Sequence, residues 1–91
     1  VIGVVGTNAR LDVAQTNVVA EAAHDGIARA VRPSHTLYDG DTLFCLATGA
    51  VHADLALVMD LAAEAVARAI VNGVLAAEGA GGLPAVRDLE S

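Results

Sequence analysis

The 91-residue sequence has no tryptophan and no lysine, and one residue each of phenylalanine, tyrosine, methionine and cysteine. Cys45 has no partner for an internal disulfide, so the sequence gives no sign of an oxidising compartment. We expect a buried, inert thiol and a cytoplasmic protein. All five basic residues are arginines, scattered along the chain against eleven acidic residues, and the net charge is −6. Nucleic-acid binding needs a basic face, so this class of function is disfavoured.

Aliphatic side chains dominate what is present: 55% of the residues are hydrophobic and 18% are charged. A chain of this length forms at most one domain, and so much aliphatic surface is difficult to bury without a partner. We therefore expect residues 1–91 to form a single segment of a larger fold. The chain starts with Val1, in an apolar run typical of a strand, rather than with methionine. This start is typical of a processed product or a fragment.

The pattern of apolar and polar residues predicts four elements: a strand over 1–6, a helix over 13–31, a strand over 42–48 and a helix over 55–78. Asp12, with Gln15 three residues later, predicts a capping box for the first helix, which ends before Pro33. Asp54 caps the second helix, and Gly79 is its expected C′ residue. This order of elements, with each strand followed by a helix, favours an α/β layered architecture whose other strands come from outside the chain.

Each predicted helix has its own distribution of apolar residues. The first carries one apolar stripe through Ala14, Val18, Ala22 and Ile27. The second is apolar around most of its circumference, which predicts a helix packed on several sides. Its polar residues Asp60, Glu64, Arg68 and Asn72 form one ridge, on which Glu64 and Arg68 have the spacing of an i,i+4 ion pair. Three charges near a bilayer centre would be costly, so we expect no membrane span.

The most informative segment is Asp39-Gly40-Asp41, directly before the second strand. Two carboxylates around a glycine place fixed negative charge at one point, as a proton-transfer or cation-binding site requires. An ordinary β-turn explains the same residues, because Asp and Gly dominate turns. A metal site formed by His35, Asp39 and Asp41 is a third interpretation, although the spacing matches no known ligand signature.

Several separate motifs occur along the chain in a defined order. They are Ile2-Gly3-Val4-Val5, Ala23-His24-Asp25-Gly26-Ile27-Ala28-Arg29, Val31-Arg32-Pro33 with His35-Thr36, and Asp39-Gly40-Asp41-Thr42 through Ala47-Thr48-Gly49. Together they resemble the C-terminal subunit of the L-aminopeptidase/D-esterase family, which includes β-peptidyl aminopeptidases and the nylon-oligomer endo-hydrolase. The resemblance covers most of the chain and is densest over residues 1–49.

The resemblance implies a precursor that cuts itself into a large N-terminal and a small C-terminal subunit. The new N-terminal Ser or Thr is then the nucleophile of an amide-cleaving hydrolase, an aminopeptidase or amidohydrolase. The implied fold is a four-layered α/β/β/α sandwich resembling N-terminal-nucleophile hydrolases and completed by the larger subunit. The αβ units are expected to form tetramers, to need no cofactor or metal, and to act on a small peptide or amide.

The same resemblance implies the site residues. Val1 aligns with the residue after the nucleophile, so a Ser or Thr is expected immediately before it. Asp39 and Asp41 match the acidic positions that flank the N-terminal Thr in the nylon-oligomer branch. We hypothesise that Asp41 contacts the nucleophile and takes part in proton transfer, while Asp39 orients and supports it. His35 and Thr36 lie in a matched segment and are expected to bind substrate, or else to brace the turn.

Two other functions remain open at this point. One is an acyltransferase related to ornithine acetyltransferase, which shares the fold type and the Thr nucleophile but passes the acyl group to an amine. The other is a catalytically inactive assembly subunit that has lost its nucleophile. The sequence does not distinguish between four classes of substrate: peptides, β-peptides, D-amino-acid esters and short polyamides.

Overall fold

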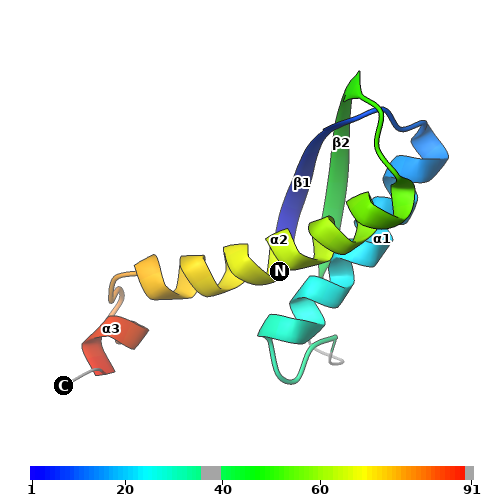
Figure 1. The fold of residues 1–91 in the computed structure, drawn as a ribbon. Helices are drawn as coiled ribbons and strands as arrows, with labels where there is room; N and C mark the ends of the chain where they lie inside the picture. Colours follow the sequence, from blue (N-terminus) through cyan, green and yellow to red (C-terminus); the bar gives the residue numbers. More distant parts are fainter. Residues whose placement is uncertain (36–39, 90–91) are drawn as a thin grey trace.

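Two parallel strands and two long helices form a small α/β unit in the computed structural model, which describes residues 1–35 and 40–89 (Figure 1). The elements are β1 (Ile2–Ala9), α1 (Val13–Ala30), β2 (Thr42–Val51), α2 (Leu55–Ala76) and a short α3 (Val86–Leu89). The predicted order of strand, helix, strand and helix is confirmed. The short helix α3 lies in the tail, where no regular element was expected.

Both strands are longer than predicted, because each extends its pairing beyond the apolar run that identified it. β1 and β2 are in parallel register from Ile2 opposite Thr42 to Thr7 opposite Ala47. After an irregularity, Ala9 lies opposite Val51, and the backbone N–H of Arg10 donates to the Val51 carbonyl at 2.7 Å. Pairing between distant segments therefore sets the strand ends.

The helix starts are as predicted. The Asp12 carboxylate accepts from the Gln15 backbone N–H at 2.7 Å, and the Gln15 side chain accepts from the Asp12 N–H at 3.0 Å. Asp54 accepts from the Ala56 N–H at 3.2 Å. These side chains satisfy backbone donors that a helix N-terminus otherwise leaves unpaired.

The predicted end of α2 is wrong. The helix ends at Ala76, and Ala77 has extended backbone angles of −64° and 147°, so Gly79 is not its C′ residue. The Ala77 N–H still donates to the Gly73 carbonyl at 3.1 Å. The predicted ion pair is confirmed, because the guanidinium of Arg68 donates to Glu64 at 2.7 Å.

The core lies between one face of the sheet and the two long helices. Its buried residues are Val5, Ala9, Val19, Ala23, Val58 and Ala62. The apolar stripe predicted for α1 is largely wrong, because Ala14 and Val18 are exposed and only Ile27 of that stripe is fully buried. The buried face is rotated by one position and runs through Val19 and Ala23.

The contact between α1 and α2 explains this rotation. A Cβ atom on Gly26 would overlap the Ala63 carbonyl, and it would lie 2.8 Å from Val66 Cβ and 2.9 Å from the Ala67 nitrogen. Only a residue without a side chain permits this approach of the two backbones. Ala23, Ala62 and Ala63 are buried at the same crossing, so small residues set the helix face that turns inward.

Much apolar surface remains exposed. On the sheet face away from the helices, the exposed fractions are 80% for Ile2, 62% for Val4, 59% for Phe44 and 67% for Leu46. We call these four residues the bare sheet face. The deep packing predicted for α2 does not occur within the described residues, where only Val58, Ala62 and Ala63 of this helix are buried.

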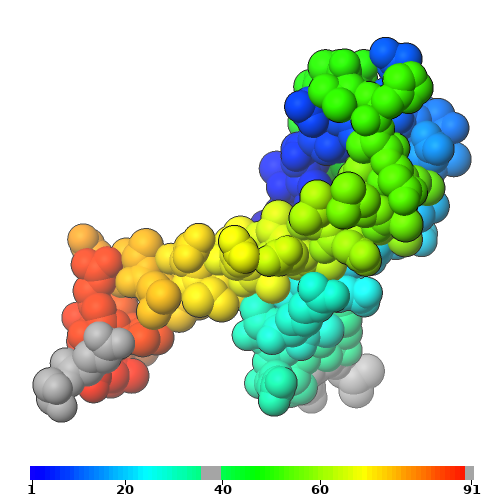
Figure 2. All heavy atoms as spheres, in the orientation of Figure 1, coloured from blue at the N-terminus to red at the C-terminus, as the bar shows by residue number. Residues whose placement is uncertain are grey.

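The C-terminal end of α2 and α3 project away from α1 and the sheet (Figure 2). The overall extents of 47 × 28 × 20 Å reflect this elongated shape. Leu75 and Val74, near the end of α2, are 54% and 48% exposed. In the described part of the chain, no helix combines the length and the apolar character that crossing a bilayer requires.

Candidate functional site

The start of both strands forms a polar corner at one edge of the sheet. Parallel strands begin at the same edge, so Val1 and Asp41, which precede β1 and β2, lie side by side. The Thr42 N–H donates to the Val1 carbonyl at 2.8 Å, which fixes their alignment. The Val1 nitrogen donates to Asp41 Oδ1 at 2.9 Å.

His35 contacts the second oxygen of the same carboxylate. His35 Nδ1 lies 2.7 Å from Asp41 Oδ2. The Asp41 side chain is 7% exposed, whereas that of His35 is 44% exposed. Each carboxylate oxygen of Asp41 therefore has a nitrogen partner from a different part of the chain.

These partners favour the ionised form of Asp41. The hydrogen bond from the Val1 amine, with a smaller contribution from His35, holds the pKa of the Asp41 carboxyl below its usual value. Partial desolvation of the carboxyl opposes this shift. Asp41 is consequently a fixed anion at neutral pH, placed next to the start of β1.

A second histidine, His24, contacts the ring of His35. The ring of His24, on α1, has its centroid 5.2 Å from that of His35, with an angle of 43° between the ring planes. Such a tilted arrangement is a favourable contact between aromatic rings. His24 Nδ1 is buried and has no hydrogen-bond partner within residues 1–35 and 40–89.

The backbone at His35 is left-handed, with φ of 53°. Residues other than glycine adopt this region uncommonly, although histidine does so more often than most. Where such a conformation occurs, the surrounding contacts have to hold it, and it is found often at functional sites. At His35 the partners are Asp41 and His24.

The structure thus brings together two of the predicted site residues, Asp41 and His35. The other two, Asp39 and Thr36, lie outside the described residues. In the described part of the chain, no group of three His, Cys, Asp or Glu side chains is placed to hold a metal ion. The metal interpretation also needs Asp39, whose position is not described.

The comparison with protein families decides what kind of protein this corner belongs to. The model of peptidase family S58 matches residues 1–86. The chain belongs to peptidase family S58. This confirms the resemblance to the L-aminopeptidase/D-esterase family that the separate motifs indicated.

Curated relatives of this S58 chain carry the name aminopeptidase. An uncharacterized aminopeptidase of Mycobacterium leprae is 46% identical over 98 aligned positions, covering 91% of this chain and 27% of the relative. An uncharacterized aminopeptidase of Mycobacterium bovis and one of Mycobacterium tuberculosis are each 42% identical over 103 positions, covering 97% of this chain and 30% of the relative. The S58 chain therefore spans less than a third of the length of these relatives.

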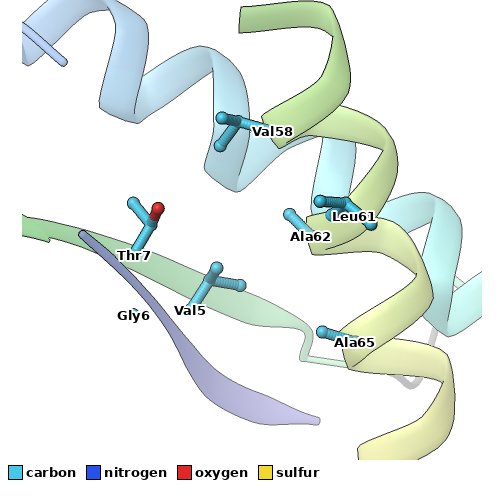
Figure 3. A pocket seen from close by; sticks show the side chains of 7 residues that line it. All are labelled: Val5, Gly6, Thr7, Val58, Leu61, Ala62 and Ala65. Carbon is cyan, nitrogen blue, oxygen red and sulfur yellow. The ribbon is translucent and has the colours of Figure 1, made fainter. Parts of the chain in front are cut away.

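An apolar cleft of about 180 Å³ lies elsewhere in the S58 chain, between β1 and α2. Its lining residues, labelled in Figure 3, are Val5, Gly6, Thr7, Val58, Leu61, Ala62 and Ala65. Thr7 carries the one side-chain oxygen in this lining, and that oxygen accepts from the Ala9 N–H at 3.1 Å. The cleft offers shape and apolar surface but no acidic or basic side chain.

The cysteine has no part in the polar corner. Cys45 lies on β2 and packs against the core, and burial raises the pKa of its thiol. A protonated thiol is a poor nucleophile and a poor metal ligand. The sequence predicted a buried, inert thiol, whereas Cys45 is half-buried, and its raised pKa agrees with low reactivity.

Sequence reasoning missed two features of the site. It did not foresee the contact of His24 with His35, since two histidines separated by ten residues form no recognisable motif. It also gave no role to Gly26, two residues after His24. A glycine within a predicted helix was the available signal, because it often marks a close approach of another backbone.

Proposed function

We propose that this chain is the small C-terminal part of a self-processing S58 hydrolase that cleaves amide bonds, and that a Ser or Thr immediately before Val1 is its nucleophile. The observation that carries the proposal is the 2.9 Å contact between the Val1 nitrogen and Asp41 Oδ1, within a chain of a peptidase family. Residues 1–91 then form one segment of an αβ heterodimer.

The position of Asp41 suits the residue before Val1. Consecutive Cα atoms are about 3.8 Å apart, so a residue joined to the Val1 nitrogen has its own backbone next to Asp41. Joining that residue turns the Val1 nitrogen into a peptide N–H and moves the positive charge to the new α-amine. The Asp41 side chain, which is 7% exposed and is also in contact with His35, is placed to attract and orient this amine.

The chemistry follows from the nucleophile being the first residue of the processed chain. A hydroxyl is a weak nucleophile and needs a neighbouring base, which the neutral α-amine supplies. The hydroxyl oxygen bonds to the substrate carbonyl carbon, its proton passes to the amine and then to the leaving amine, and the amide C–N bond breaks. Water then hydrolyses the ester, which releases the acid and restores the hydroxyl.

Asp41 acts in this scheme by holding the amine and stabilising its protonated form during transfer. Asp39 keeps its predicted role of orienting and electrostatic support, and Thr36 its predicted contact with substrate. The donors that stabilise the oxyanion come from the larger subunit. The match to a peptidase family favours transfer of the acyl group to water over transfer to an amine, as in the acyltransferase alternative.

The exposed apolar surface supports the remaining part of the proposal, a four-layered α/β/β/α sandwich completed by the larger subunit. The bare sheet face is wide and apolar, as one inner face of two stacked sheets is. The exposed apolar side chains of α2 then contact the larger subunit or a neighbouring αβ unit. Tetramers of αβ units cover more of this surface than one heterodimer does.

Intact mass spectrometry of the protein expressed from the complete gene tests the processing step. We expect two chains, the smaller one carrying a single Ser or Thr before Val1. A single uncut chain, or a different residue before Val1, contradicts the proposal and favours the inactive assembly subunit.

An assay with aminoacyl p-nitroanilides tests the chemistry of the processed protein. Asp41→Asn removes the negative charge and keeps the shape, so we expect kcat to fall by about 10²-fold or more. Glu21→Gln makes the same chemical change at an exposed position of α1 and serves as the matched control, with kcat unchanged. Full activity of Asp41→Asn would remove Asp41 from the mechanism.

A further inference from the structure

We propose that His35 is a positioning residue for Asp41: its Nδ1–H fixes one carboxylate oxygen so that the other faces the start of β1, and the ring of His24 holds His35 in place. This role rests on the proposed function of Asp41. It differs from the substrate contact that the sequence predicted for His35 and makes specific the alternative, in which His35 braces the turn, because Nδ1 lies 2.7 Å from Asp41 Oδ2.

The need for such a residue follows from the carboxylate itself. The terminal torsion of an aspartate has broad preferences, so the rotamer alone does not aim a particular oxygen. At Asp41, Oδ2 lies 2.7 Å from His35 Nδ1 and Oδ1 lies 2.9 Å from the Val1 nitrogen. Two donors on different oxygens fix the rotation of the carboxylate plane, with Oδ1 facing the nitrogen to which the nucleophile is joined.

The contact also identifies which ring nitrogen of His35 carries a proton. An ionised carboxylate only accepts hydrogen bonds, so Nδ1 of His35 carries a proton whether the ring is neutral or cationic. In the neutral ring, Nε2 is then the acceptor. The charged and titratable groups around Asp41 among the described residues are the Val1 amine, His35 and, behind it, His24.

Two contacts hold His35. They are the approach of its Nδ1 to Asp41 and the tilted contact with the His24 ring at 5.2 Å, and together they support the left-handed backbone with φ of 53°. His24 belongs to α1 and lies two residues before Gly26, where α1 packs closely against α2. A polar side chain on a loop is thereby connected to the helix contact in the core.

The decisive test compares His35→Asn with His35→Gly in the full-length protein. Asparagine and glycine both tolerate a left-handed backbone, so neither substitution strains the chain. Asparagine keeps an N–H donor near the position of Nδ1, whereas glycine removes it. His52→Gly is the matched control, since His52 is exposed and lies beyond the other end of the sheet.

With an aminoacyl p-nitroanilide as substrate, we expect kcat of His35→Gly to fall by about 10- to 100-fold, with KM little changed. His35→Asn should restore kcat to within about 3-fold of the wild type, and His52→Gly should match the wild type. Without the His35 donor, the ionised carboxylate of Asp41 is less stabilised. Asp41 therefore binds a proton, or the protonated α-amine of the nucleophile residue, more tightly. The acid limb of the kcat–pH profile should therefore move to higher pH in His35→Gly and much less in His35→Asn.

Two results overturn the positioning role while leaving the proposed function intact: wild-type kcat and pH profile in His35→Gly, or equal losses in His35→Asn and His35→Gly. If His35→Gly does not fold, His35→Gln replaces it, because its longer side chain carries the amide away from the Nδ1 position. Equal kcat in His35→Asn and His35→Gln then overturns the role. A wild-type protein that neither cleaves itself nor hydrolyses the substrate overturns the proposed function, and the role of His35 with it.

Discussion

At the scale of single residues, Asp41 combines low exposure with two nitrogen partners. Most aspartates are exposed, and a carboxylate out of water is stable only when it is paired or hydrogen-bonded. The Val1 nitrogen and His35 provide this compensation. The same contacts that lower the pKa of Asp41 also fix the orientation of its carboxylate, so its charge and its geometry have one structural cause.

The lowered pKa of Asp41 leads to a prediction about acid stability. A carboxyl with a pKa lower in the folded than in the unfolded protein stabilises the fold above its unfolded pKa, and this stabilisation is lost as the pH falls through the folded pKa. We expect the wild type to have a higher Tm than Asp41→Asn at pH 6–7, and the difference to shrink below about pH 4.

Thermal unfolding of the two proteins across this pH range measures the effect. Glu21→Gln, on the exposed side of α1, gives the background expected from removing any surface carboxylate. A Tm difference for Asp41→Asn that is constant from pH 7 to pH 3 would mean that the ionisation of Asp41 is not coupled to folding.

At the scale of elements, α1 and α2 approach each other closely at Gly26. Replacing glycine by alanine inside a helix ordinarily stabilises it by up to about 1 kcal/mol. At Gly26 we expect the opposite sign, because the added methyl group overlaps the Ala63 carbonyl and crowds Val66 and Ala67. Overpacking of this kind costs about 1–3 kcal/mol or more.

Gly73 offers a matched control for this prediction. It lies in α2, where a Cβ would meet no atom within 4 Å, so Gly73→Ala should raise the free energy of unfolding by about 0.5–1 kcal/mol. Chemical denaturation of both variants gives the two values. If Gly26→Ala stabilised the protein as much as Gly73→Ala does, the two helices would not pack as described.

The elements also show which features the sequence could predict. Asp12, Gln15 and Asp54 locate the helix starts correctly because a cap acts within one turn of its own chain. The strand ends at Ala9 and Val51 depend on pairing between distant segments, so local patterns place them too early. Local patterns likewise could not show which side of α1 would be buried, since the close contact at Gly26 decides it.

The candidate site shows the same difference between features set by local sequence and features set by distant contacts. Asp41 and His35 were foreseen, with roles that remain predictions, because they precede a strand within a short motif. The contact of His24 with His35 joins a helix to a loop and leaves no trace in the local pattern. The partner at the start of β1 is a backbone nitrogen, which every residue but proline offers and which no sequence motif can single out.

At the scale of the whole molecule, the unit exposes more apolar surface than an isolated domain of this size normally would. The bare sheet face and the projecting end of α2 contribute much of it. Large exposed apolar patches are typical of interaction surfaces. The curated relatives are more than three times as long as the span matched here.

This surface gives a prediction about assembly. Phe44→Arg places a charge in the bare sheet face, and we expect the full-length protein to lose its native oligomeric state and to aggregate or remain soluble only in part. Size-exclusion chromatography with light scattering measures the mass. Ala28→Arg, at an exposed position of α1, is the control and should leave the mass unchanged. A native mass for Phe44→Arg would show that the bare sheet face is not an interface.

The contact at Gly26 has a practical consequence for changing this protein by design. His24 lies two residues before the crossing, on the same helix, and its ring backs the histidine next to Asp41. Substitutions that shift α1 along α2 by even a fraction of an ångström will also shift that ring. We therefore expect substitutions at this crossing to change thermostability and the proposed activity together, so a library built to improve one should be screened for the other.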